Sequence, residues 1–213
     1  MKIKVLKPIL EANESIADEV REVLREQGVK LVNIIGSPGS GKTSLLEKTL
    51  TYLSPEEIGI IEGDISTTYD AERVYCMGAE VVQINTQGAC HLDANMIKES
   101  LQNLTLNNKK IIFIENVGNL VCPAEFRLGE DLRIIVLSLT EGEHKPLKYP
   151  LSFKSSQVLI INKIDLLPHL KVDMKGIIEE AKKINPDLKV FPLSSLSGEG
   201  FSGWIEYIRR FIA

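Results

Sequence analysis

The eight residues from Gly36 to Thr43, GSPGSGKT, limit the possible folds of this chain more than any other segment. They follow the apolar run 31–35 and precede a helical pattern at 44–50. In a G-x-x-x-x-G-K-[ST] loop, backbone N–H groups turn inward around phosphate oxygens, the lysine neutralises phosphate charge and the hydroxyl can ligate Mg²⁺. The sequence therefore predicts a phosphate-binding loop (P-loop) between a buried strand and a helix. The predicted nucleotide contacts are Gly36, Ser37, Pro38, Gly39, Ser40, Gly41, Lys42, Thr43 and Ser44.

Short apolar runs alternate with longer amphipathic stretches along the chain. This rhythm is typical of strand–helix–strand units in which helices cover both faces of a parallel sheet. We expect an α/β fold of the P-loop NTPase type, with a mostly parallel sheet of about seven strands and helices on both faces. Residues 12–27 predict an amphipathic helix ahead of the first strand, and residues 1–213 are expected to form a single domain. The strand candidates are 31–35, 58–62, 80–84, 111–115, 133–138, 158–162 and 189–193.

The composition indicates an ordinary globular protein. The 213 residues include 25 Lys plus Arg against 29 Asp plus Glu, a net charge of −4, so we expect no nucleic-acid partner. No segment approaches the ~20 apolar residues of a membrane span, and the N-terminus lacks the pattern of a signal peptide. We therefore expect a cytoplasmic protein with no membrane partner. The three cysteines are too few and too scattered for a disulfide framework.

A second motif indicates which nucleotide the loop binds. Asn162, Lys163 and Asp165 form N-K-x-D at the end of an apolar run. A carboxylate at Asp165 can accept hydrogen bonds from both N1–H and the exocyclic amino group of guanine, a pair of donors that adenine does not offer. The motif alone is a weak signal, but after a P-loop it predicts GTP rather than ATP. Ser194, after the last strand, is where a loop that supports the base would lie.

Carboxylates at the ends of other strands are candidate Mg²⁺ ligands beside Thr43. Asp64 follows the second predicted strand and Glu115 ends the fourth. Gly118 could offer its N–H to a γ-phosphate and move when that phosphate leaves. The sequence offers no obvious Gln or Arg finger to position an attacking water, so we expect slow intrinsic hydrolysis that a partner accelerates. The candidate catalytic residues are Lys42, Thr43, Asp64 and Glu115.

Cys90 and His91 lie side by side near the predicted start of a helix, where exposed N–H groups favour a thiolate. A soft anionic ligand beside an imidazole suits Ni²⁺ or Zn²⁺, and Cys122 is the third candidate ligand. Because three ligands do not complete a tetrahedral site, water or a second chain would supply the rest. Spacing alone leaves two interpretations open, a metal site or buried cysteines beside a capping or core histidine. Cys76 is expected to pack in the interior.

Several long motifs together resemble the HypB family of hydrogenase nickel-insertion GTPases, from about residue 12 to the end of the chain. In order, they are GDISTTYDAERV, QINTQGACHLDANM, FIENVGNLVCPAEFRLGE and SLTEGEHKPLKYP, in addition to the P-loop and NKID. The resemblance implies a P-loop GTPase of the dimerising class that includes UreG. The Cys-Pro-His metal motif of the urease branch is absent, which favours the hydrogenase branch.

The resemblance implies a GTP-hydrolysing metallochaperone that delivers nickel during NiFe-hydrogenase maturation. GTP would favour a homodimer, and Cys90, His91 and Cys122 would hold Ni²⁺ or Zn²⁺ across that dimer. Lys148 would reach the guanine of the neighbouring subunit, and Asp70 would belong to the switch region. A metallochaperone and the hydrogenase large subunit are the expected partners. Residues 1–30 contain no Cys or His, so transfer through this site is expected rather than nickel storage.

Two other classes of function remain open at this point. In a nucleotide-gated scaffold protein, the metal would be a structural zinc and hydrolysis would be incidental. A small-molecule phosphotransferase would share the P-loop and the Mg²⁺ carboxylates, but NKxD argues against it because such kinases usually take ATP.

Overall fold

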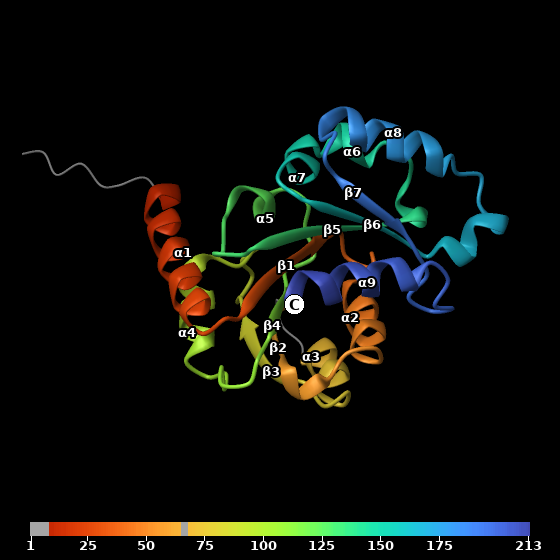
Figure 1. Cartoon of the computed structure of the whole chain (residues 1–213). Coiled ribbons are helices and arrows are strands. Elements are labelled where there is room, and N and C mark those ends of the chain that lie inside the picture. Colours follow the sequence, from red (N-terminus) through yellow and green to blue (C-terminus); the bar gives the residue numbers. More distant parts are fainter. Residues whose placement is uncertain (1–8, 65–67) are drawn as a thin grey trace, which may run out of the picture.

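The computed structural model describes residues 9–64 and 68–213, and its centre is a parallel sheet (Figure 1). Seven strands lie in the order β3-β2-β4-β1-β5-β6-β7, and every neighbouring pair is parallel. The expected α/β fold with about seven strands is confirmed, and the sheet is wholly parallel. The strands are β1 (Lys30–Gly36), β2 (Ile58–Asp64), β3 (Glu80–Asn85), β4 (Ile111–Glu115), β5 (Leu132–Ser138), β6 (Val158–Asn162) and β7 (Lys189–Pro192).

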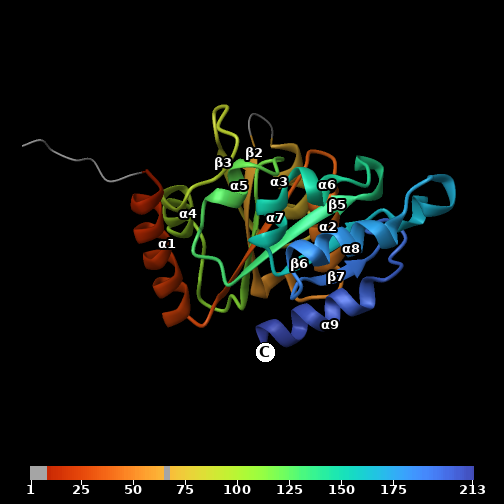
Figure 2. The same cartoon turned by 90° about the horizontal axis from the view of Figure 1, so that it is seen from above.

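Helices cover both faces of the sheet. The core between the sheet and α2, α3 and α9 includes Leu45, Val74 and Trp204, while α1, α4, α7 and α8 pack on the opposite face. Figures 1 and 2 show α1 and α4 side by side. The α-helices are α1 (Ile9–Glu26), α2 (Lys42–Leu50), α3 (Tyr69–Tyr75), α4 (Ala94–Leu101), α5 (Cys122–Glu125), α6 (Lys145–Lys148), α7 (Pro150–Lys154), α8 (Met174–Ile184) and α9 (Phe201–Ile212). Short 3₁₀ helices span Pro55–Glu57, Leu139–Glu141 and Ile164–His169.

The N-terminal helix is fixed to the domain rather than detached from it. Its expected range, 12–27, lies close to the observed range of α1, and it buries Val20 and Leu24 against the sheet and α4. Asn13 connects two other segments, because its Nδ2 donates to the Arg127 carbonyl and its Oδ1 accepts from the Ala94 N–H. Within the described ranges, no helix is long and apolar enough to cross a bilayer.

The order of the strands brings the predicted site residues to one edge of the sheet. The P-loop follows β1, while Asp64 and Glu115 end β2 and β4. Because β2, β4 and β1 are adjacent and parallel, their carboxyl ends lie together, where ligands of α/β sheets bind. One sequence-based expectation is wrong: Cys76 is exposed, because it follows the last residue of α3 instead of facing the core.

Candidate functional site

The P-loop is held in place by the N-K-x-D motif. Asn162 Nδ2 donates to the Ser40 carbonyl (3.1 Å), and Lys163 Nζ donates to the Gly39 carbonyl (2.7 Å). Gly41 has a φ of +94°, and a Cβ atom there would lie 2.3 Å from Asn162 Nδ2. A side chain at position 41 would therefore both strain the backbone and displace this contact. The two motifs thus form one structural unit.

A cavity of about 420 Å³ opens beside the P-loop. It is lined by residues from the loop itself, from the ends of β2 and β4, and from α3. Lys42 and Thr43 are buried at the start of α2, where the N–H groups of a helix N-terminus favour an anion. The lining residues are Pro38, Gly39, Gly41, Lys42, Thr43, Ser44, Glu62, Gly63, Asp64, Asp70, Arg73, Glu115, Asn116, Val117, Gly118 and Lys163.

Three carboxylates meet in this cavity. Oxygens of Glu62, Asp70 and Glu115 lie within 4.8 Å of one another. Burial, together with the nearby charges of Glu115 and Asp64, raises the pKa of Glu62 from 4.5 to about 8. Burial also raises the pKa of Glu115 to about 7, although Lys42 and the Thr43 hydroxyl oppose that shift. The cluster therefore disfavours ionisation of these carboxyl groups, and a bound cation would favour their charged forms.

The donor atoms of this cluster fit a magnesium ion. Thr43 Oγ1 donates to Glu115 Oε1 (2.8 Å), so hydroxyl and carboxylate are adjacent. Glu62 Oε2 and Glu115 Oε2 are buried and make no hydrogen bond within the described ranges. Hard oxygen ligands of this kind are the ones that Mg²⁺ prefers. Asp64 lines the same cavity, so the predicted set Thr43, Asp64 and Glu115 is found at one place.

Sequence reasoning missed Glu62 and Arg73. Glu62 lies inside β2, two residues before Asp64, the Mg²⁺ ligand that the sequence predicts at the end of this strand. Arg73 forms ion pairs with Glu47 (2.5 Å) and Asp70 (3.0 Å), and thereby orients Asp70 toward the cavity. A charged residue within an otherwise apolar strand was the available signal for Glu62, whereas nothing in the linear sequence paired Arg73 with Glu47.

The predicted base-binding residues also meet in space. Ser194 Oγ donates to Asp165 Oδ1, and the Ser195 N–H donates to Asn162 Oδ1 (3.1 Å). Asp165 is thus oriented by the loop after β7, where the sequence placed a base-supporting segment. Lys148, at the end of α6, is exposed. A different lysine of α6, Lys145, reaches the P-loop by donating to Ser37 Oγ (3.1 Å).

Cys90, His91 and Cys122 form a second cluster, with donor atoms within 4.8 Å of one another. The sulfurs of Cys90 and Cys122 are 2.9 Å apart, and Cys90 Sγ is 3.6 Å from His91 Nδ1. The contact with the Cys90 thiol raises the pKa of Cys122, and burial adds to the shift. Cys90 and His91 precede α4 instead of occupying its first turn, because Asp93 is the N-cap residue. Two thiols and an imidazole are ligands suited to nickel or zinc.

Comparison with known proteins identifies the family. Residues 30–192 match the family model described as "CobW/HypB/UreG, nucleotide-binding domain". The chain is also 44% identical over 209 residues to the hydrogenase maturation factor HypB of Azotobacter chroococcum, covering 98% of this chain and 68% of that protein. The chain belongs to the HypB branch of this family.

Solved HypB structures have the same fold. The crystal structure of HypB from Archaeoglobus fulgidus aligns with a TM-score of 0.89 at 38% identity, covering 96% of this chain and all of that one. HypB from Helicobacter pylori, crystallised in complex with nickel, aligns with a TM-score of 0.90 at 33% identity and covers 94% of this chain and 95% of the other. The structural similarity to HypB therefore extends over almost the whole of this chain.

The resemblance stated from motifs is thus confirmed as family membership. The motifs that carry it include residues that line the cavity and the three residues of the Cys90, His91 and Cys122 cluster. Part of the predicted switch segment, residues 65–67, lies outside the described residues. Of its neighbours, Asp64 and Asp70 both line the cavity.

Proposed function

We propose that this HypB-family chain is a GTPase that carries nickel during hydrogenase maturation and couples its nickel affinity to the bound nucleotide. The observation that carries the proposal is that the nucleotide cavity and the Cys90, His91 and Cys122 cluster share one short segment of the chain. Glu115 and Gly118 line the nucleotide cavity, and Cys122 follows on the same segment. The names of the relatives, and the nickel in the Helicobacter pylori protein, support hydrogenase maturation and nickel as the cargo.

Guanine selection is assigned to the N-K-x-D motif. Asp165 Oδ1 accepts from Ser194 and can still accept a second hydrogen bond, so Oδ1 and Oδ2 together can accept from N1–H and the amino group of guanine. Lys42 and the N–H groups at the start of α2 balance phosphate charge. Thr43, with Asp64, Glu115 and the neighbouring acids, would hold Mg²⁺, which neutralises charge developing on the phosphates when bound.

Intrinsic hydrolysis is expected to be slow. No glutamine is among the residues that line the cavity in the described ranges, and its arginine, Arg73, is paired with Glu47 and Asp70. The group that positions an attacking water would then come from a partner or from a second subunit. A single-turnover rate of the isolated protein well below about 1 s⁻¹ is expected.

GTP-dependent dimerisation is supported by an exposed apolar surface beside the metal cluster. Val121 is exposed directly before Cys122, Leu147 is exposed on α6, and Leu151 is exposed on α7. The Leu120 carbonyl accepts a hydrogen bond from Ser152, so these segments are neighbours. A two-fold axis here would bring two Cys90, His91 and Cys122 sets together and complete the coordination of one metal. Lys148 lies between Leu147 and Leu151, as required for reaching a neighbouring subunit.

The decisive experiment is a nickel titration of the protein loaded with a non-hydrolysable GTP analogue and, separately, with GDP. We expect about one nickel per two chains in the analogue form and an affinity that differs between the two states. Cys90→Ser and Cys122→Ser should each abolish this binding while GTP affinity changes little. Cys76→Ser is the matched control, because Cys76 is an exposed thiol outside the cluster.

The alternative function is a nucleotide-gated scaffold protein with a structural zinc. This alternative predicts that the protein is purified with zinc, and that its zinc content and zinc affinity are the same in the GTP and GDP forms. If both cysteine variants bound nickel as tightly as the wild type, the metal assignment itself would be wrong.

A metallochaperone that supplies the nickel and a hydrogenase large subunit that receives it are the partners we infer, since a carrier needs a donor and an acceptor.

A further inference from the structure

One buried carboxamide joins the loop that carries the metal cluster to the segment that lines the nucleotide cavity. Asn116 follows Glu115 at the end of β4 and lines the cavity together with Val117. Its Oδ1 accepts hydrogen bonds from the N–H groups of Val117 (3.0 Å) and Leu92 (3.2 Å). Leu92 directly follows His91. A nucleotide phosphate that moves the Val117 amide therefore acts on the same oxygen that holds the backbone beside His91.

Leu92 has a second contact with the nucleotide site. Its side chain is buried against Gly63, where a Cβ atom would lie 2.8 Å from Leu92 Cδ1. Gly63 separates Glu62 from Asp64 in β2, and all three residues line the cavity. The residue after His91 is thus packed directly on the strand that carries two of the cavity's acids.

The nitrogen of the same carboxamide leads into the core. Asn116 Nδ2 donates to Asn33 Oδ1 (3.3 Å), and Asn33 Nδ2 donates to Glu130 Oε1 (3.3 Å). Asn33 is 0% exposed and lies in the middle of β1, among apolar residues. A carboxamide in such a strand costs free energy unless its hydrogen bonds are made, so packing alone does not explain its presence.

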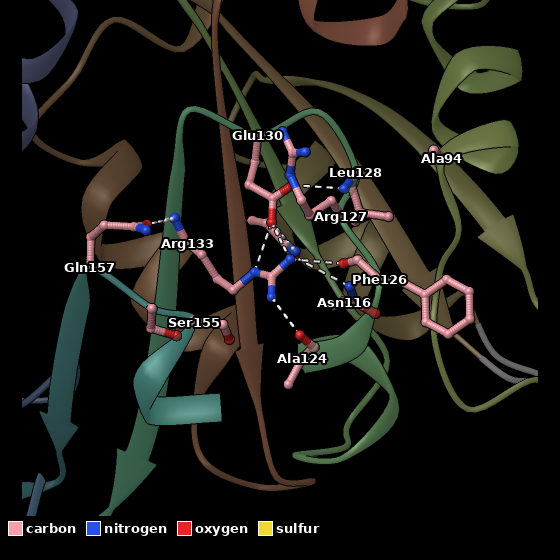
Figure 3. Close-up of polar contacts among 12 residues, drawn as sticks. Ala94, Asn116, Ala124, Phe126, Arg127, Leu128, Glu130, Arg133, Ser155 and Gln157 are labelled. Carbon is pink, nitrogen blue, oxygen red and sulfur yellow. Dashed lines mark hydrogen bonds and ion pairs between the residues drawn. The ribbon is translucent and has the colours of Figure 1, made fainter. Parts of the chain in front are cut away.

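From Glu130 the hydrogen bonds lead through Arg133 to the segment that follows Cys122. Glu130 Oε1 accepts from Arg133 Nε (2.7 Å), and Arg133 donates to the carbonyls of Ala124 (2.9 Å) and Phe126 (2.8 Å). Figure 3 shows the Arg133 guanidinium between Glu130 and these carbonyls. Ala124 belongs to α5, which begins with Cys122, and the Phe126 ring centroid is 4.0 Å from that of His91. One network therefore holds both the segment that follows His91 and the segment that follows Cys122.

The geometry points to Asn116 and Asn33 as positioning residues that transmit the state of the nucleotide site to the Cys90, His91 and Cys122 cluster, an inference that rests on the function proposed above. A γ-phosphate that attracts the N–H groups of Val117 and Gly118 reorients the Asn116 carboxamide. Its bonds to Leu92 and to Asn33 change at the same time, so the backbone beside His91 shifts relative to α5. The distances between the three metal ligands change accordingly.

Asn33→Leu tests this inference, because Asn33 neither lines the cavity nor belongs to the metal cluster. Nickel dissociation constants are measured for the full chain in its GDP form and in its GTP-analogue form. For the wild type we expect the two constants to differ by about fivefold or more. For Asn33→Leu the ratio should fall to within about twofold of one, with nucleotide affinities unchanged, because the coupling is lost and the sites remain. Thr49→Val is the matched control, since it removes the buried hydrogen bond from Trp204 outside this network and should keep the wild-type ratio.

The outcomes separate this inference from the proposed function. A wild-type ratio of one would contradict the proposed coupling of nickel to nucleotide as a whole. A large wild-type ratio that Asn33→Leu retains would overturn only the role of the two asparagines. If Asn33→Leu does not fold, hydrogen exchange of the wild type decides the matter. The Leu92 N–H should then differ in protection by about tenfold between the two nucleotide forms, and equal protection would overturn the inference.

Discussion

At the residue scale, the nucleotide site concentrates charge that the folded chain alone does not neutralise. Glu62 is only 3% exposed, and the negative charges of Glu115, Asp64 and Asp70 act on it in the same direction as burial. Lys42 opposes them but does not outweigh them. Such clusters are typical of sites prepared for a cation, where stability is given up for binding.

Glu62→Gln should make the metal-free and nucleotide-free protein more stable at pH 8. In the folded chain Glu62 keeps its proton up to about pH 8, whereas its ordinary value is 4.5. Its contribution to stability is therefore fully present below about pH 4.5 and is lost as the pH rises toward 8. We expect a gain of about 1–3 kcal/mol in the free energy of unfolding, measured by urea denaturation in EDTA.

The gain from Glu62→Gln should shrink as the pH is lowered from 8 to 5, and Mg²⁺ should stabilise the variant less than the wild type. Glu179→Gln serves as the control, because Glu179 is exposed on α8. Equal stability of Glu62→Gln and wild type at pH 8 would contradict the raised pKa of Glu62.

Asp165→Asn should reduce discrimination between guanine and hypoxanthine. Inosine triphosphate lacks the exocyclic amino group, so the wild type should prefer GTP over it. The variant should bind GTP roughly 10- to 100-fold more weakly and show a GTP-to-ITP affinity ratio near one, because a charged acceptor is replaced by an amide. Fluorescence competition titrations measure both affinities, with the exposed Asp187→Asn as control. A preference for GTP that survives in Asp165→Asn would place guanine recognition elsewhere.

At the scale of elements, α1 is joined to the domain by polar contacts as well as by its apolar face. Asn13 is buried and makes both of its hydrogen bonds to backbone groups, at 2.7 Å and 2.8 Å. One of these groups is the N–H of Ala94, the first residue of α4. The contact thus connects α1 both to the helix after the Cys90 and His91 loop and to the segment after α5.

Asn13→Ala should lower the free energy of unfolding by about 2–4 kcal/mol, because it leaves two backbone groups buried without partners. Urea denaturation measures this loss. Asn95→Ala provides the control, since Asn95 is an exposed residue of α4 whose Nδ2 donates to Glu99, and it should cost less than about 0.5 kcal/mol. Similar losses for the two variants would show that the Asn13 contacts are not important for docking α1.

At the scale of the whole molecule, one surface combines exposed apolar side chains with the candidate metal ligands Cys90, His91 and Cys122. Leu147 is 60% exposed on α6, and both α6 and α5, which begins with Cys122, contact α7. Leu196 is 86% exposed, but it lies in the loop after β7, two residues from Ser194. Exposed leucines are common, so only the combination with a shared site distinguishes the first surface.

Leu147→Asp should abolish dimerisation in the presence of a GTP analogue and leave the thermal stability of the monomer unchanged. A charge that becomes buried and unpaired in the interface costs several kcal/mol there, while on an exposed monomer surface it costs little. Sedimentation velocity with the analogue measures the dimer, and Leu196→Asp should dimerise as the wild type does. A Leu147→Asp protein that still dimerises would exclude this surface.

The fold and the nucleotide loop could be predicted from the sequence because they depend on local patterns. Gly36 to Thr43 and the motif at Asn162 to Asp165 are contiguous, and each carries a fixed relation between spacing and backbone geometry. The strands at 58–62 and 111–115 were recognised because buried parallel strands are short and continuously apolar. Because the carboxyl ends of parallel strands lie at one edge of a sheet, Asp64 and Glu115 were expected near the P-loop, whereas the order of the strands came from the structure.

Contacts between distant segments were decided only by the tertiary structure. Glu62 joins Asp70 and Glu115, Arg73 pairs with Glu47, and Asn33 lies between Asn116 and Glu130, although no spacing in the chain relates these residues. The spacing left the meeting of Cys90 with Cys122 as one of two open interpretations, and the family resemblance favoured it. The physical reason is that a periodic pattern determines which residues are buried, whereas the partner of a buried polar group depends on how strands and helices far apart in sequence are packed together.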